Sequence, residues 1–104
     1  MRPGLPLVVL LLAGCAGPKP EVESVRVQRV RDGKALVTIA LRNQNGGDGE
    51  ATVDVTLRDG SGAVVAREEI DVDLEPHERV TVSREIPVPG AGDVVALAEA
   101  RYPP

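Results

Sequence analysis

The stretch at residues 51–58, Ala-Thr-Val-Asp-Val-Thr-Leu-Arg, alternates apolar and polar side chains without exception. Successive side chains of an extended strand point to opposite faces, so Ala51, Val53, Val55 and Leu57 share one face. The polar residues between them share the other face. This pattern predicts a β-strand that is buried on one side.

Three further segments carry related patterns. Residues 37–42 and 80–86 alternate in the same way, except that Arg84 stands where an apolar residue is expected. Residues 64–74 alternate as well, but Glu68 interrupts their apolar face. We therefore predict three more strands, with a bulge or a change of sheet near Glu68.

The first and last strands are predicted from weaker patterns. Val25 and Val27 are two positions apart and would share one face of a strand, whereas Val30 would fall on the opposite face. Near the end of the chain, alternate residues from Val94 to Tyr102 form a face of small side chains. The alanines in residues 94–101 also permit a helix, which is the alternative for this segment.

Turn residues separate these segments. Asp32-Gly33 and the Asp-Gly-Ser-Gly run at residues 59–62 accept the positive φ angles that tight hairpins require. Residues 45–49 and 87–92 make longer loops. Short strands with one apolar face each can bury that face by packing as two sheets. We therefore predict an all-β fold, an immunoglobulin-like β-sandwich of six to seven strands.

The composition disfavours several classes of partner. Tyr102 is the only aromatic residue, so the chain offers no platform for stacking nucleic-acid bases. The formal net charge of −4 disfavours phosphate backbones and anionic lipid headgroups. Cys15 is the only cysteine, so the chain can form no internal disulfide. We expect no nucleic-acid partner and a fold that depends on packing alone.

The first residues resemble the signal peptide of a bacterial lipoprotein. Arg2 supplies a positive charge, and the apolar core at residues 5–12 is well short of the roughly 20 residues that span a bilayer. Leu12-Ala13-Gly14-Cys15 resembles the lipobox at all four positions. The resemblance implies signal-peptidase recognition of Leu12, Ala13 and Gly14, cleavage after Gly14, and lipidation of Cys15.

The resemblance also implies domain boundaries and a location. Residues 1–14 are then a cleaved signal peptide, residues 15–21 are the lipidated cysteine with a Pro-rich tether, and residues 22–104 are the β-sandwich. The tether would reach at most about 20 Å. Ala16 occupies the position where an aspartate retains enteric lipoproteins at the inner membrane. The lipobox therefore implies anchoring in the outer membrane, facing the periplasm, where the source has two membranes.

Residues 35–86 resemble two families of bacterial surface domains. The run from Val55 to Asp59 is similar to the F-x-L-Y-D motif of the FxLYD family, with Val55 and Arg58 in place of the two aromatic residues. His77 stands in place of glycine in that family's Leu-x-Pro-Gly-Glu turn. Asn43 before a Gly-rich loop is also similar to the bacterial cell-adhesion-related (CARDB) family. Both resemblances imply a β-sandwich used for interaction, with no catalytic residues.

His77 and two serines are the candidates for catalysis. His77, the only histidine, lies near Glu75 and Glu78 in a turn that Pro76 begins. We interpret it as a solvated turn residue, because zinc needs three or four ligands and a lone general base lacks further support here. Neither Ser61 nor Ser83 lies in a nucleophile elbow.

Side-chain oxygens near the Gly-rich loop are the candidates for calcium. Calcium accepts oxygen ligands of the kind that this segment offers, namely Asn43, Asn45, Asp48 and Glu50. The same residue types satisfy local backbone groups in plain turns, which is the alternative interpretation. The acidic run from Glu68 to Asp73 is interpreted as a solvated strand face. We expect no metal site and no cofactor.

The sequence predicts a non-catalytic protein-interaction or structural module of the cell envelope. A lipid at Cys15 would hold it to the membrane. Loops or a strand edge would contact another envelope protein. The alternative is an envelope lipoprotein that binds a small ligand or calcium.

Overall fold

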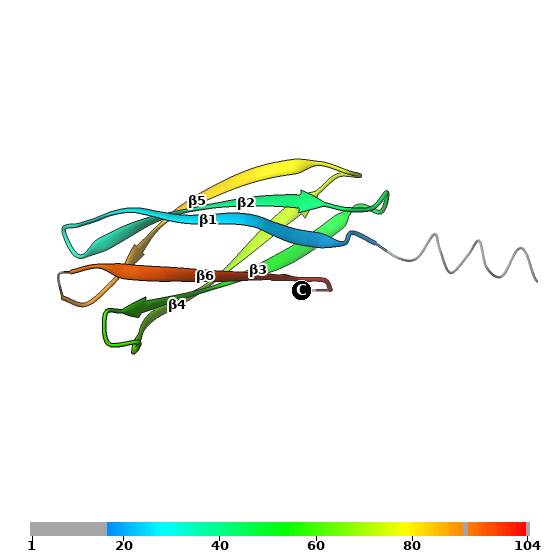
Figure 1. Cartoon of the computed structure of the whole chain (residues 1–104). Coiled ribbons are helices and arrows are strands. Elements are labelled where there is room, and N and C mark those ends of the chain that lie inside the picture. The colour runs from blue at the N-terminus through cyan, green and yellow to red at the C-terminus, as the bar shows by residue number, and fades with distance from the viewer. Residues whose placement is uncertain (1–16, 91, 104) are drawn as a thin grey trace, which may run out of the picture.

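The computed structural model describes residues 17–90 and 92–103, which form six β-strands and no helix (Figure 1). In chain order the strands are β1 (Pro20–Arg31), β2 (Lys34–Asn43), β3 (Gly49–Asp59), β4 (Val64–Leu74), β5 (Arg79–Pro87) and β6 (Val94–Arg101). They form two antiparallel sheets, in the orders β1-β2-β5 and β4-β3-β6. The predicted β-sandwich is confirmed. The described residues contain no helix that could cross a membrane.

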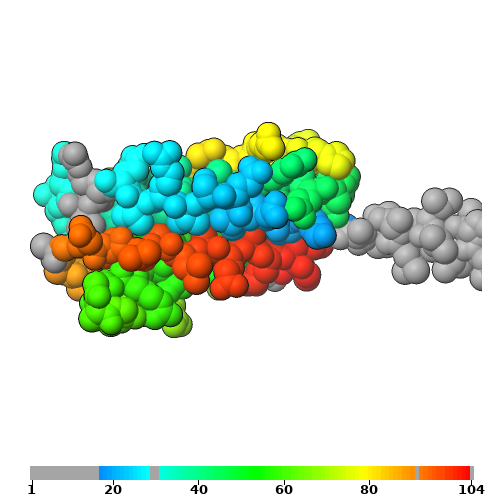
Figure 2. All heavy atoms as spheres, viewed as in Figure 1, coloured from blue at the N-terminus to red at the C-terminus, as the bar shows by residue number. Residues whose placement is uncertain are grey.

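The two sheets pack face to face. Hairpins join β1 to β2 and β3 to β4, and the chain changes sheet after β2, β4 and β5. The edge strands β1 and β6 lie side by side along one side of the sandwich (Figures 1 and 2), and β4 and β5 are the edges of the other side. The body is elongated, because the strands run along its long axis (Figures 1 and 2).

The central strands β2 and β3 supply the middle of the core. Their apolar faces meet between the sheets, which fully buries Val37, Ile39, Leu41, Val53 and Leu57. Outer strands complete the core with Ile70, Val72, Leu74, Ile86 and Ala98. Each large apolar side chain buried in this way contributes about 1.5–3 kcal/mol. Residues 51–58, which alternate strictly, belong to β3, the central strand of its sheet.

The predicted tight turns are confirmed. Asp32 and Gly33 have φ angles of 53° and 74°, the pair of positive values that a type I′ hairpin turn requires. In the turn between β3 and β4, Asp59 Oδ1 accepts hydrogen bonds from the backbone N–H groups of Ser61 and Ala63, at 2.9 and 3.1 Å. In both turns, the residues that set the backbone geometry are close neighbours in the sequence.

Register shifts in β1 explain why its valines change parity. The pairing with β2 shifts between Val22 and Ser24, and again between Val27 and Val30. Each shift is a bulge that gives β1 an extra residue and so reverses which face later side chains take. Val22, Val25 and Val27 consequently pack against the same core. β1 begins at Pro20, ahead of the residue 22 at which the sandwich was expected to begin.

β4 does contain a bulge, at Val65, but it does not resolve the interruption at Glu68. The pairing of β3 with β4 shifts between Leu57↔Ala66 and Arg58↔Val64, and from Ala66 to Leu74 it continues without interruption, with no change of sheet. Glu68 keeps the inward parity and lies opposite Val55. It is tolerated because β4 is an edge strand, so its carboxylate reaches the side of the sandwich, where the side chain remains 32% exposed.

Residues 94–101 form a strand, and the helical alternative is wrong. This segment, β6, pairs with β3 from Thr52↔Arg101 to Asp59↔Val94. Its inward side chains are Val94 and three alanines, which pack against the core. Pairing with a central strand outweighs the helix propensity of alanine, which is worth less than about 1 kcal/mol per residue.

Candidate functional site

The lipidation candidate Cys15 and the recognition residues Leu12, Ala13 and Gly14 lie outside the described residues. The described part of the chain begins at Gly17. Gly17 and Lys19 lead into β1, with Pro18 buried between them. The segment that was predicted as a tether is therefore packed against the sandwich from Gly17 onward.

Asn43 holds this entering segment in place. Its side chain is fully buried at the end of β2, and its Oδ1 accepts hydrogen bonds from the backbone N–H of Lys19 at 3.0 Å and of Asn45 at 3.2 Å. Its Nδ2 donates to the carbonyls of Gly47 at 2.7 Å and Glu75 at 2.9 Å. One side chain thus joins the entering segment to two loops that are distant in sequence.

Three glycines allow the chain to come close at the same end of the molecule. A Cβ on Gly47 would collide with the backbone of Gly17, and a Cβ on Gly17 would collide with the ring of Tyr102. A Cβ on Gly49 would lie 3.2 Å from Cδ of Pro18. We call Gly17, Pro18, Asn43, Gly47 and Tyr102 the entry cluster.

The oxygens proposed as calcium ligands are used in this packing. Both hydrogen bonds to Oδ1 of Asn43 come from backbone N–H groups, and Oδ1 of Asn45 accepts from the N–H of Gly47 at 3.1 Å. Asp48 and Glu50 are exposed. Within residues 17–90 and 92–103, no three His, Cys, Asp or Glu side chains gather as a metal site. These contacts favour the interpretation of the loop as a plain turn.

His77 occupies a turn position that suits glycine. Its φ angle is 58°, its side chain is exposed, and its N–H donates to the carbonyl of Asn45 at 3.0 Å. The left-handed region is costly for a residue with a Cβ. The turn between β4 and β5 requires a positive φ at this position, so His77 adopts a backbone conformation that glycine would adopt at lower cost.

The two serines have partners that do not include His77. Ser61 Oγ donates to Asp59 Oδ1 at 2.6 Å, inside the turn between β3 and β4. Ser83 Oγ lies 3.2 Å from Thr38 Oγ1 on the outer face of the other sheet. The structure therefore does not bring the candidate nucleophiles and the histidine together.

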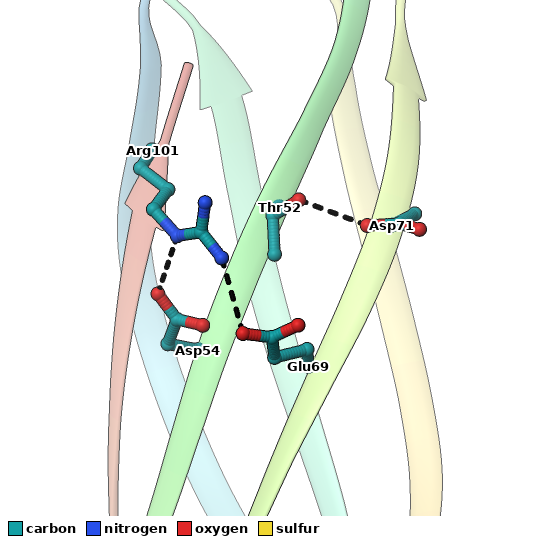
Figure 3. A network of polar contacts seen from close by, with 5 residues as sticks. All are labelled: Thr52, Asp54, Glu69, Asp71 and Arg101. Carbon is teal, nitrogen blue, oxygen red and sulfur yellow. Dashed lines mark hydrogen bonds and ion pairs between the residues drawn. The ribbon is translucent and has the colours of Figure 1, made fainter. Parts of the chain in front are cut away.

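Arg101 forms ion pairs with Asp54 and Glu69 on the outer face of the β4-β3-β6 sheet, as Figure 3 shows. Its Nε donates to Oδ2 of Asp54 at 2.8 Å, and its Nη2 donates to Oε2 of Glu69 at 3.1 Å. Beside it, Thr52 Oγ1 donates to Oδ1 of Asp71 at 2.8 Å. The hydrogen bond from Arg101 lowers the pKa of Asp54, although desolvation opposes this effect. The sequence suggested a solvated acidic face here but did not show that one arginine crosses it.

A shallow concavity of about 610 Å³ lies near the β1–β2 hairpin. Its lining residues are Gln28, Arg31, Asp32, Lys34, Leu36 and Glu85. The two cations and two anions balance, and Leu36 is the only one of the six that is not exposed. The concavity therefore has no buried polar group that would select a ligand.

Comparison with known proteins identifies no family. No family model matches the chain, and no curated protein matches it. Among solved structures, a glycosyl hydrolase family 2 member from Bacteroides cellulosilyticus is similar, with a TM-score of 0.47 and 23% identity. The similarity covers 69% of this chain but spans only 10% of that much longer chain.

Proposed function

We propose that this protein is a lipid-anchored β-sandwich of the bacterial cell envelope that acts as a non-catalytic protein-interaction or structural module. The lipid is attached to Cys15, in the lipobox that Leu12, Ala13 and Gly14 complete. Ala16 after the cysteine favours the outer membrane, with the domain facing the periplasm. No metal ion or other cofactor takes part.

The observation that carries this proposal is the entry cluster. Asn43 bonds to the backbone of Lys19, and Gly47 packs against Gly17, so the sandwich begins two residues after Cys15. Two residues reach at most about 7 Å. A lipid on Cys15 therefore holds the domain directly at the membrane surface, which suits a module that presents its sides to neighbouring proteins.

Replacing Cys15 tests the anchor. Each buried methylene of an acyl chain contributes about 0.8 kcal/mol, so a protein with two or three chains stays on the membrane. We expect the wild type to incorporate a clickable fatty acid and to partition into the detergent phase, whereas Cys15→Ser incorporates no label. Ala16→Ser is the matched control, because it changes the neighbouring residue and leaves the thiol.

Two results would contradict the proposal. One is a wild-type protein that takes up no fatty acid. The other is a Cys15→Ser protein that is labelled and partitions like the wild type. In both variants, an unchanged far-ultraviolet circular dichroism spectrum shows that the sandwich is intact.

A further inference from the structure

The four edge strands of the sandwich differ in how well they are protected against pairing with another chain. Charged side chains and bulges discourage a new strand from adding to a sheet edge. β4 carries five charged residues among Arg67–Asp73, β5 carries Arg79, Arg84 and Glu85, and β1 has two register shifts. Three of the four edges therefore have a recognised protective feature.

β6 has none of these features over most of its length. Its first five residues, Val94 to Ala98, are uncharged, and its pairing with β3 shows no register shift. β3 is its one hydrogen-bonded neighbour in the described chain. β1, in the other sheet, follows β6 closely along its length (Figure 2) but forms no backbone hydrogen bond with it. Val95 and Leu97 point outward and are 66% and 55% exposed, more than any other large apolar side chain that the structure describes.

We propose that the free edge of β6 binds an extended segment of another envelope protein, which adds a fourth strand to the β4-β3-β6 sheet. Backbone hydrogen bonds supply the affinity in this mode of recognition, and alternate side chains supply the specificity. The proposal rests on the proposed function and names the surface through which the module acts.

Charge and exposure define the chemistry of the segment. Val95 and Leu97 favour apolar or β-branched residues beside them on the outer face. Glu99 lies directly across from Asp54, and this pairing of like charges is unfavourable. Arg101 neutralises Asp54, but no ion pair of the described residues includes Glu99. The partner segment should therefore carry apolar residues at alternate positions, beside Val95 and Leu97, and a lysine or arginine beside Glu99.

A second copy of this chain does not fit the edge when both copies are anchored. A closed dimer is two-fold symmetric, and a two-fold axis between identical strand edges pairs them antiparallel. Because β6 runs along the long axis of the body, antiparallel pairing would put the two entry clusters at opposite ends of the dimer. Two lipids in one membrane leaflet cannot take those positions.

The test uses fluorescent peptides and the purified full chain in detergent. Each peptide is as long as β6, 8 residues, and alternates valine with threonine, while a single lysine occupies each position in turn across the panel. The best peptide is then N-methylated at odd or at even positions. Because alternate residues of a strand point their N–H groups at the neighbouring strand, one methylated form should lose at least about tenfold in affinity and the other should not.

Variants of β6 provide the matched controls. Leu97→Lys should weaken binding by about tenfold or more, whereas Thr81→Lys, at an exposed position of β5, should leave it unchanged. Glu99→Gln should remove the preference for one lysine position. All three substitutions lie at exposed positions, and circular dichroism verifies the fold of each variant.

Three results would overturn the proposal: no peptide of the panel binds, both methylated forms bind equally, or Leu97→Lys binds as the wild type does. A wild-type dimer in sedimentation that Leu97→Lys dissociates would assign the edge to a second copy instead. These measurements do not depend on acylation. A failure of the Cys15 labelling experiment would therefore be distinguishable from a failure of this one.

Discussion

Glu68 and Arg84, the two charged residues that interrupt the apolar alternation of their strands, face one another across the two sheets. Glu68 lies opposite the buried Val55 in one sheet, and Arg84 lies opposite the buried Val37 in the other. Arg84 Nε is 3.9 Å from Glu68 Oε2, and the two side chains are 48% and 32% exposed. Each charge at an inward position is thus explained by the other, at the side of the sandwich that β4 and β5 form.

This pair is expected to protect an edge more than to stabilise the fold. A partly exposed ion pair contributes less than about 1 kcal/mol, so Glu68→Val with Arg84→Val should leave the free energy of unfolding nearly unchanged. The same double variant should self-associate, because the edges of β4 and β5 become more apolar. Urea unfolding and sedimentation measure the two effects. The reversed pair, Glu68→Arg with Arg84→Glu, is the control and should stay monomeric; if it associates as the valine variant does, the explanation is wrong.

Asn43→Ala is expected to lower the free energy of unfolding by about 3 kcal/mol or more. The substitution removes the four hydrogen bonds of this fully buried side chain, which join it to partly buried backbone groups of Lys19, Asn45, Gly47 and Glu75. Each buried polar group left unsatisfied costs about 1–3 kcal/mol. Asn45→Ala is the control, since it removes the bond to Gly47 and should cost about 1 kcal/mol. Equal losses in the two variants, measured by urea unfolding, would contradict the central role of Asn43.

Gly47→Ala should loosen the entering segment by steric conflict alone. The added Cβ would occupy the space of the Gly17 backbone. We expect a loss of about 1–3 kcal/mol, together with faster proteolysis near Gly17. Gly60→Ala is the matched control, because a Cβ there meets no atom within 4 Å. Identical proteolysis of the two variants would show that Gly17 does not depend on Gly47.

His77→Gly is expected to raise the free energy of unfolding by about 1 kcal/mol, since glycine adopts a positive φ without the cost that a Cβ imposes. His77→Ala keeps a Cβ at the same φ and should change stability by less than about 0.5 kcal/mol, with function retained. Thermal unfolding compares the three proteins. If His77→Ala, present at the normal protein level, failed to restore the phenotype of a gene deletion that the wild type restores, the imidazole would instead have a chemical role.

Stability should fall in acid as two aspartates are protonated. The hydrogen bond from Arg101 lowers the pKa of Asp54, and the hydroxyl of Ser61 lowers the pKa of Asp59. Their contribution is complete above the pKa of the unfolded chain, near pH 4, and is lost as pH falls through the lower folded pKa. Carboxyl NMR titration should show the pKa of Asp54 rising in Arg101→Gln while that of Asp59 stays. If the pKa values of Asp54 and Asp59 shifted equally in Arg101→Gln, the specific contact between Arg101 and Asp54 would be contradicted.

The class of fold and much of its local detail follow from the order of the amino acids alone. Alternation depends only on residues two positions apart, so residues 51–58 identified a strand with one buried face. Asp32-Gly33 identified a tight hairpin because positive φ is a property of those residues. At residues 94–101 local propensity left helix and strand open, and there the pairing with β3 made the choice.

Which distant residues meet depends on how the whole chain packs. Nothing in the sequence relates Glu68 to Arg84, because their contact depends on which strands become edges and on how the sheets stack. In the sequence Asn43 is one of several oxygen-bearing residues near a loop, whereas the fold brings it into contact with Lys19 and Glu75, which are far from it in sequence. The open edge of β6 likewise depends on strand order. Periodicity reports the face that a residue takes, whereas strand order and long-range hydrogen bonds arise only when the whole chain packs.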